Sequence, residues 1–274
     1  MWLYEKTLGK RREGVYELKR LYKDLRARSW GISRAGKTNR ITIANDPDIG
    51  DAEGLVRRFS SDLAVFRQVL LKKQYKPLTD YVQECGDAHA IRAIVDAGAN
   101  TGYTTLFLNR KFPHARIVSI EPDPESFMML LDTIARNKLE RIKPIQSGLW
   151  STNEPLAIDK TFRDKRSWSF RVQPSNEASS IPGVTMRTLM DTFTMPSIDI
   201  LKIDIEGGEV AVFAEDSAVA AFLPRVRYLA IEIHDEFRIR PAIMTHLKRH
   251  GFSHMERGEL TIARNLTFAP RKIS

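Results

Sequence analysis

The spacing of hydrophobic positions changes along this chain. Five short apolar runs, rich in β-branched residues, begin near residues 91, 117, 141, 197 and 225. Between most of these runs, apolar residues recur every three or four positions, as in an amphipathic helix. Strands that alternate with helices are joined by crossovers and lie parallel in one sheet. The pattern therefore predicts an α/β fold with helices on both faces of a mostly parallel sheet, closed by an antiparallel hairpin over residues 252–266.

The first part of the chain has a different pattern. Residues 10–28 place apolar side chains at helical spacing among Lys and Arg, which predicts a basic amphipathic helix. Such a helix could cap the domain, pair with another chain, or contact an anionic surface such as a membrane or a phosphate. Residues 29–53 are rich in Gly, Asn, Asp and Pro, and this composition predicts a loop or short strands.

A second helical stretch precedes the first β-branched run. Residues 60–87 predict a helix that Ser61 or Asp62 caps and that Pro77 ends or kinks. We therefore expect three parts: a basic helical extension with a loop over 1–58, a helical cover over 59–90, and an α/β domain over 91–274.

A glycine-containing turn follows the first predicted strand. The run ends at Asp96, and Gly98 and Gly102 frame the sequence G-A-N-T-G before the next helix. Glycines at such a turn allow a ligand to approach the backbone, and the helix N-terminus offers free N–H groups. Dinucleotide sites use G-x-G-x-x-G instead, and an acid at position 96 would repel a pyrophosphate but suit a cation. The turn predicts a cofactor site; the alternative is a plain strand–turn–helix unit.

An acidic residue ends the second predicted strand. Glu121 follows the run Ile117 to Ile120, and a carboxylate there can accept two hydrogen bonds from the vicinal diol of a ribose. Together with the turn, this resembles the S-adenosylmethionine (SAM) site of Rossmann-like methyltransferases. Residues 147–149, at the end of the third strand, should then lie beside an adenine ring.

Charged side chains also end the fourth and fifth predicted strands. Lys202, Asp204 and Glu206 share one strand face by the period of two. A lysine inside an apolar strand requires a carboxylate partner, for which Glu232 and Asp96 are the candidates. The fifth strand ends in Glu232, His234 and Asp235. Since carboxyl ends of parallel strands share one edge of the sheet, we expect both clusters to border one cleft.

Composition and charge narrow the class of protein. Of 274 residues, 28% are charged and 42% hydrophobic, as in soluble globular proteins. The net charge of +9 comes mostly from residues 1–40, which hold 12 Lys or Arg and four acids, so the remainder does not favour a polyanion. No apolar run reaches the roughly 20 residues of a membrane span, and no signal-peptide core is present. Cys85 is the single cysteine, which excludes an intrachain disulfide, and we expect a cytoplasmic protein.

Five ordered segments resemble the FkbM family of SAM-dependent methyltransferases: SDLAVFRQVL, IVDAGANTGYTT, SIEPDPESF, ILKIDIEGGE and IEIHDEF. The resemblance covers about residues 60–265 and leaves the basic helix outside. It implies a Rossmann-like class I fold with a seven-stranded sheet, SAM as cofactor, and O-methylation of hydroxyls on sugars, glycans or secondary metabolites. The residues expected to bind SAM are Asp96, Gly98, Ala99, Asn100, Gly102, Glu121, Ser147, Gly148, Leu149 and Asp204.

The catalytic prediction concerns the proton of the acceptor hydroxyl. His234 is the first candidate for a general base because an imidazole titrates near neutrality, with Asp204 or Glu206 as alternatives or as orienting groups. All three could instead only pair with Lys202 and cap the sheet edge. A Mg²⁺ ion at Asp204, Glu206 and Asp235 is conceivable from the hard oxygen ligands, but no metal is expected.

Other readings of function stay open at this point. A nucleic-acid methyltransferase would use the same cofactor site and the basic N-terminal segment for phosphates. A non-catalytic binding module or a nicotinamide dehydrogenase would need a different cofactor, and the G-A-N-T-G spacing weighs against the dehydrogenase. The expected partners are a small-molecule or glycan acceptor and, for residues 10–28, an anionic surface; a homo-oligomer is possible.

Overall fold

A computed structural model describes residues 29–58, 60–159, 170–177 and 180–269 of the 274-residue chain. The expected basic helix over residues 10–28 falls outside the described residues. No helix within those described ranges is long and apolar enough to cross a membrane.

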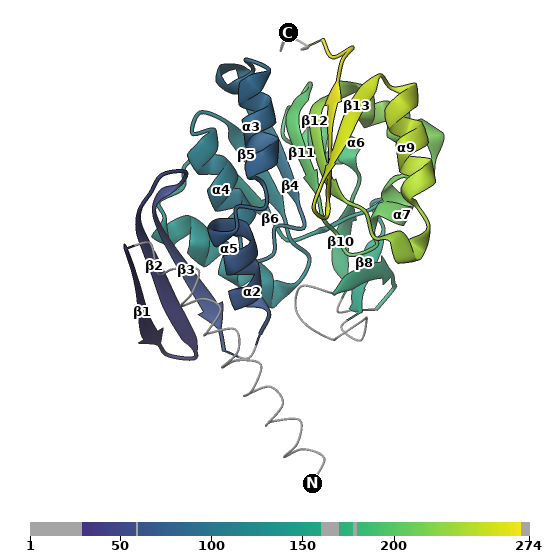
Figure 1. The fold of residues 1–274 in the computed structure, drawn as a ribbon. Helices are drawn as coiled ribbons and strands as arrows, with labels where there is room; N and C mark the ends of the chain where they lie inside the picture. The colour runs from purple at the N-terminus through teal and green to yellow at the C-terminus, as the bar shows by residue number, and fades with distance from the viewer. Residues whose placement is uncertain (1–28, 59, 160–169, 178–179, 270–274) are drawn as a thin grey trace.

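A seven-stranded sheet forms the centre of the molecule (Figure 1). Its strand order is β13-β14-β12-β11-β4-β5-β6, and β14 alone runs antiparallel to both of its neighbours. The strands are β4 Ala93–Ala97, β5 Arg116–Ile120, β6 Ile142–Ile145, β11 Ile198–Ile203, β12 Val226–Glu232, β13 Phe252–Arg257 and β14 Leu260–Asn265. This confirms the predicted α/β fold with a mostly parallel sheet and a closing hairpin.

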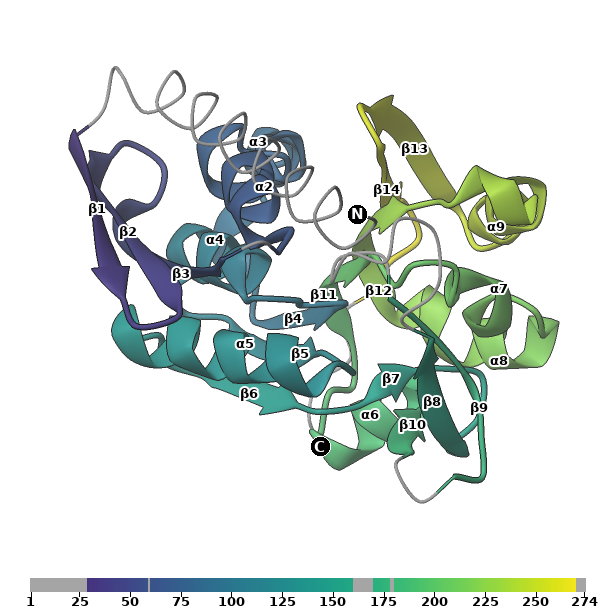
Figure 2. The same cartoon turned by 90° about the horizontal axis from the view of Figure 1, so that it is seen from below.

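Helices cover both faces of the sheet because successive strand residues point to opposite sides (Figure 2). Ile94 and Ile200 pack in one hydrophobic cluster with residues of α3 and α4. Val95 and Leu201 pack in a second cluster with residues of α6, α8 and α9. The helices are α3 Lys76–Glu84, α4 Tyr103–Lys111, α5 Pro124–Arg136, α6 Met186–Thr192, α7 Glu209–Val212, α8 Asp216–Phe222 and α9 Arg240–Arg249, with short 3₁₀ turns η2 Ala88–Ala90, η4 Leu223–Arg225 and η5 Asp235–Phe237.

Residues 29–57 form a separate antiparallel sheet rather than a loop. Its strands are β1 Ser29–Ala35, β2 Thr38–Asp46 and β3 Gly50–Arg57. In β2, Ile41 and Ile43 alternate with polar residues and bury one face, while Gly36 adopts the positive φ of +58° that the tight turn before β2 requires. Of the two alternatives that the sequence left open for residues 29–53, a loop or short strands, the structure shows strands.

The segment after this sheet is helical, but it is not the single capped helix that we expected. Helix α2, Asp62–Phe66, continues into the π-helix η1, Arg67–Leu71, and α3 follows separately. Ser61 is the N-cap residue of α2 without a side-chain capping bond, and the Asp62 carboxylate binds Arg57 instead. Pro77 lies in the first turn of α3, where the missing N–H costs nothing, rather than ending a helix.

A small four-stranded sheet includes parts of the polar stretch over residues 151–183. Its order is β7-β10-β8-β9. The strands are β7 Gly148–Leu149, β8 Pro155–Asp159, β9 Arg171–Pro174 and β10 Ile181–Val184. Leu156, Val172 and Ile181 form its own buried cluster, which explains how a polar sequence still folds there.

Candidate active site

A cavity of about 460 Å³ lies at the carboxyl ends of the central strands. The ends of β4, β5, β11 and β12 border it on the sheet side, and α2, η1 and the residues before α3 contribute Val65, Gln68, Val69, Gln74 and Tyr75. The predicted cofactor residues that line it are Gly98, Ala99, Asn100, Glu121, Gly148, Leu149 and Asp204. Asp96, Gly102 and Ser147, which we also predicted, do not line it.

The turn after β4 requires glycine at one position for two reasons. Gly98 has φ +78°, and a Cβ atom built there would lie 1.8 Å from the carbonyl oxygen of Asp204. The backbone cannot easily move away, because the N–H groups of Gly98 and Ala99 both donate to the carbonyl of Ile120. Gly102, with φ +82°, is the N-cap residue of α4 and ends the glycine turn. The turn therefore brings bare backbone to the cavity wall.

Backbone N–H groups orient the carboxylate of Glu121. Its Oε2 accepts from the N–H of Asn100 at 2.7 Å, and its Oε1 accepts from the N–H of Asp123 at 2.9 Å. Burial raises the pKa of Glu121 to about 7, although these two bonds favour the ionised form. The side chain therefore changes charge near neutral pH at the cavity wall.

Lys202 is buried below the glycine turn and pairs with Asp96. Its Nζ lies 3.2 Å from Oδ1 of Asp96 and donates to the carbonyls of Ala97 and Gly98. Burial alone would lower the pKa of Lys202, but the charges of Asp96 and Asp204 raise it, so the lysine stays protonated. Of the two partners that the sequence offered, the structure places Asp96 against Lys202, and none of the described ion pairs joins Lys202 to Glu232.

The side chain of Asp96 is fully buried and faces the protein rather than the cavity. Its Oδ2 accepts from the Thr105 hydroxyl at 2.7 Å, while its Oδ1 faces Lys202. Ser147 is similarly committed, since its hydroxyl donates to the carbonyl of Pro182 at 2.7 Å. Neither of these two predicted site residues lines the cavity, and both bind protein groups next to its wall.

His234 lies among carboxylates. Its Nδ1 is 3.1 Å from Oε1 of Glu209, and its Nε2 is 3.5 Å from Oε2 of Glu206 and 3.9 Å from Oε1 of Glu232. Burial alone would lower its pKa, but the Glu209 bond and the surrounding negative charges raise the pKa of His234 to about 9. A protonated imidazole cannot accept a proton. This environment weighs against His234 as the general base at neutral pH.

The three carboxylates considered as an alternative magnesium site do not all meet. Asp235 is bound through both carboxylate oxygens to Arg240, at 2.7 and 2.8 Å, and points to the surface. Asp204 and Glu206 both line the cavity. Within the described residues, the group whose ligand atoms lie close enough for a metal ion is Asp204, Glu232 and His234.

Sequence reasoning missed the cavity wall opposite the sheet. Gln74 lines the cavity, and its Nε2 is buried without a hydrogen-bond partner among the described residues. Gln68 donates from Nε2 to Oε2 of Glu259 at 3.0 Å, which links η1 to the turn between β13 and β14. The π-helical turn that places these residues is closed by the N–H of Lys72 and the carbonyl of Arg67, and no sequence signal distinguishes it from an α-helix.

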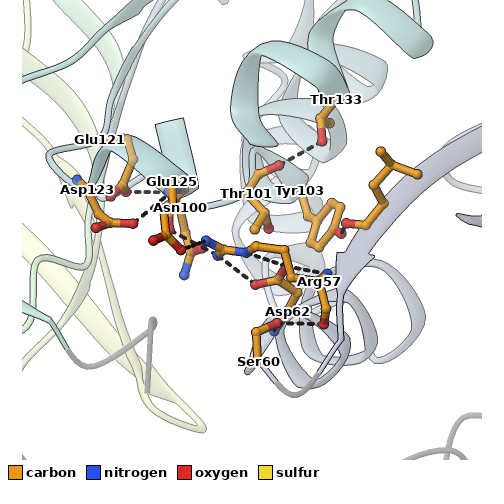
Figure 3. A network of polar contacts seen from close by, with 12 residues as sticks. Arg57, Ser60, Asp62, Asn100, Thr101, Tyr103, Glu121, Asp123, Glu125 and Thr133 are labelled. Carbon is orange, nitrogen blue, oxygen red and sulfur yellow. Dashed lines mark hydrogen bonds and ion pairs between the residues drawn. The ribbon is translucent and has the colours of Figure 1, made fainter. Parts of the chain in front are cut away.

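A polar network connects the N-terminal sheet to the helices beside the glycine turn (Figure 3). Arg57, at the end of β3, holds the buried Asp62 through two side-chain bonds of 2.9 and 2.8 Å and reaches the Ser126 hydroxyl at 3.2 Å. The Tyr103 hydroxyl at the start of α4 donates to the carbonyl of Leu55 in β3. Contacts from β3 therefore reach both helices that flank the glycine turn.

Curated proteins with similar sequences are named as methyltransferases. The protein "Methyltransferase sdnD" from Sordaria araneosa is 25% identical over 244 residues, which cover 77% of this chain and 91% of that protein. "Methyltransferase 1" from Beauveria bassiana is 26% identical over 141 residues, which cover 43% of this chain and 56% of that protein.

Solved structures resemble this chain more distantly. An rRNA methylase from Streptococcus thermophilus has a TM-score of 0.42 at 11% identity, over 69% of this chain and 95% of that one. A precorrin-6y C5,15-methyltransferase from Geobacter metallireducens has a TM-score of 0.37 at 11% identity, over 63% of this chain and 78% of that one.

The family comparison agrees with the ordered motifs and the site. The model of the methyltransferase FkbM domain matches residues 96–253, which span the glycine turn, Glu121 and the ends of β11 and β12. This chain is therefore a SAM-dependent methyltransferase of the FkbM family.

Proposed function

We propose that the protein transfers the methyl group of SAM to a hydroxyl oxygen of a sugar, a glycan or a secondary metabolite. One observation carries this proposal: a single cavity of about 460 Å³ joins the glycine turn and Glu121 to the carboxylates Asp204 and Glu206. A methyl donor and an acceptor must share one space, because in-line transfer needs the reacting atoms in close contact.

The residues of the cavity suit the chemical groups of SAM. Glu121 would accept hydrogen bonds from the ribose hydroxyls, and Gly148 and Leu149 would border the adenine. Asp204 would face positive charge of the cofactor. The buried Nε2 of Gln74 has no hydrogen-bond partner within the described residues and would donate to the cofactor carboxylate. These donors and acceptors match a ligand that carries a diol, a cation and a carboxylate.

The protein has two tasks once the cofactor is bound. Bound SAM supplies a sulfonium whose methyl group is already activated. The chain must hold the acceptor oxygen and accept its proton, and Asp204 and Glu206 line the cavity where that proton would leave. We assign His234 a positioning role in the neutral pH range, because its imidazolium lies 3.5 Å from Glu206 and 3.1 Å from Glu209.

The charge of the cavity supports a neutral acceptor. Asp204, Glu206 and Glu259 line it, and these carboxylates disfavour an acceptor that carries phosphates nearby. The alternative of a nucleic-acid methyltransferase depends on the basic residues of the N-terminal segment 1–28. That segment contains nine Lys or Arg and four acidic residues in the sequence.

A methyl-transfer assay separates these alternatives. The full chain would be incubated with methyl-labelled SAM and panels of hydroxylated sugars, glycans and metabolites, with RNA as a comparison at low and moderate salt. We expect a methyl ether on a small hydroxylated acceptor and no labelling of RNA. Labelled RNA whose yield falls on deletion of residues 1–28, which leaves β1 intact, would contradict the proposal in favour of nucleic acid.

The pKa of Glu121 predicts how cofactor affinity depends on pH. Because the folded-state pKa of about 7 exceeds the ordinary value of 4.5, ionisation of Glu121 is complete only above neutrality. Its contribution to the stability of the free protein is largest below pH 4.5 and is lost as pH rises through about 7. The ribose hydroxyls bind the ionised form, so SAM affinity should rise from pH 6 to pH 8, by up to about tenfold per unit below the pKa.

Calorimetric titrations with SAM at pH 6, 7 and 8 test this expectation. Glu121→Gln should weaken binding and remove the pH dependence, because an amide does not titrate. Glu125→Gln is the matched control, since Glu125 has a 73% exposed side chain on the adjoining helix and does not line the cavity. An affinity of the native chain that is constant over this range would be inconsistent with ribose binding by Glu121.

A further inference from the structure

We propose that Asp204, Glu232 and His234 form a binding site for a divalent transition-metal ion at the ends of β11 and β12. The three residues each offer one ligand atom, and these atoms lie within 4.8 Å of one another. Asp204 and Glu232 line the cavity, so an ion held by them would face the space where the acceptor lies.

The orientation of His234 is the second, independent observation. The side chain is 5% exposed, and Nδ1 contacts the fully buried carboxylate of Glu209 at 3.1 Å. This contact leaves Nε2 directed at the carboxylate cluster, where it makes no hydrogen bond although it is buried. A carboxylate that holds one ring nitrogen while the other faces a metal is the usual surrounding of a metal-binding histidine. Glu209 therefore acts as a positioning residue.

The donor set indicates the class of ion. One imidazole nitrogen with two carboxylate oxygens suits Mn²⁺, Fe²⁺ or Zn²⁺, whereas Ca²⁺ and Mg²⁺ prefer oxygen ligands alone. Neighbouring ligand atoms at about 2.1 Å from an ion lie about 3.0–3.4 Å apart, so the present spacing of up to 4.8 Å closes with shifts of about 1 Å in each side chain. Three protein ligands leave coordination positions open toward the cavity.

The balance of charge at this point favours a cation. Asp204, Glu206, Glu232 and Glu259 converge on the cavity, whereas Lys202 lies 3.2 Å from Asp96 and 3.9 Å from Asp204 and offsets only part of this charge. An ion would take the place of the imidazole proton and neutralise the carboxylates. Its role rests on the proposed function: a Lewis acid beside the acceptor hydroxyl stabilises the oxygen as it loses its proton.

Titration of the metal-stripped full chain with Mn²⁺, followed by electron paramagnetic resonance in the absence of SAM, tests the site. We expect one bound ion per chain. His234→Ala and Glu232→Gln should weaken Mn²⁺ binding by at least about 100-fold, and Glu209→Gln by about 10- to 100-fold, as for other groups that orient a metal ligand. Asp235→Asn is the matched control, because Asp235 follows His234 directly but binds Arg240, and it should leave the Mn²⁺ affinity unchanged.

Thermal unfolding of each variant shows whether lost Mn²⁺ binding reflects lost folding, and Asp204→Asn provides a further ligand variant if Glu232→Gln unfolds. Absence of stoichiometric Mn²⁺ binding by the native chain would overturn the site. Equal weakening by Asp235→Asn and Glu232→Gln would also overturn it. A separate SAM titration distinguishes this result from a failure of the proposed function, because loss of SAM binding leaves the Mn²⁺ measurement valid.

Discussion

Gly98→Ala should reduce SAM affinity by more than about 100-fold and lower the unfolding temperature, since a buried overlap costs at least about 1–3 kcal/mol. The added Cβ would lie 1.8 Å from the carbonyl oxygen of Asp204, far inside van der Waals contact. Both sides of this contact are fixed. The N–H of Gly98 donates to Ile120 at 3.0 Å, and the N–H of Asp204 donates to Ala97 at 3.1 Å. Relief of the overlap must therefore separate β4 from the end of β11, which borders the proposed cofactor site.

Calorimetric SAM titration and thermal unfolding of the two variants Gly98→Ala and Gly258→Ala measure this effect. Gly258 is the matched control because its φ of +63° carries a similar backbone cost, of order 1 kcal/mol, while no atom lies within 4 Å of the added Cβ. We expect Gly258→Ala to bind SAM normally with a small loss of stability. Normal SAM binding by Gly98→Ala would show that the turn is not the cofactor cradle.

Lys202→Met should destabilise the fold by about 3–5 kcal/mol, because removal of one partner of a buried ion pair leaves an uncompensated charge. Asp96 is fully buried, and Lys202 has 1% of its side chain exposed. The lysine also holds the carbonyls of Ala97 and Gly98 in place, at 3.0 and 2.6 Å. We therefore expect SAM binding to fall together with stability.

Chemical denaturation of Lys202→Met and of Lys76→Met measures the contribution of burial. Lys76 pairs with Asp80 on the surface, with side chains 41% and 44% exposed, and such pairs contribute about 0.3–0.5 kcal/mol. In a double-mutant cycle, Asp96→Asn combined with Lys202→Met should cost less than the sum of the single changes, because the unpaired charge is gone. Additive costs would mean that the two charges do not interact.

Local patterns were enough to predict the sheet and many of the residues that line the cavity at its edge. The apolar runs gave the central strands, since a strand buried on both faces shows as a continuous hydrophobic segment. The glycine spacing and Glu121 lie within one strand–turn–helix–strand unit, so their relative placement follows from local chain geometry. The ion pair of Lys202 could also be predicted, because a buried lysine is nearly always paired with a carboxylate.

Contacts between distant segments could not be predicted in the same way. The sequence suggested that Asp62 caps a helix, yet its carboxylate is held by Arg57 from the preceding strand. His234 looked like a base because its ordinary pKa is near neutral, but Glu209 and Glu206 come to it from another strand end and keep it protonated. Gln74 carried no signal at all, because its position depends on an unpredicted π-helical turn.

The contacts of β3 and β14 have a consequence for what counts as one cooperative folding unit. The recognisable family segment spans residues 96–253, but β14 lies beyond it and separates β12 from β13 in the sheet. Before the N-terminal boundary of that segment, the carbonyl of Leu55 in β3 accepts a hydrogen bond from the Tyr103 hydroxyl. Phe66 packs edge-on against the same ring at a centroid distance of 5.2 Å. A chain trimmed to the recognisable segment would keep Gly98, Glu121 and Asp204 but expose its apolar interior. Recombination at residues 96 and 253 would therefore transfer the glycine turn, Glu121 and Asp204 to another protein without a segment that folds by itself.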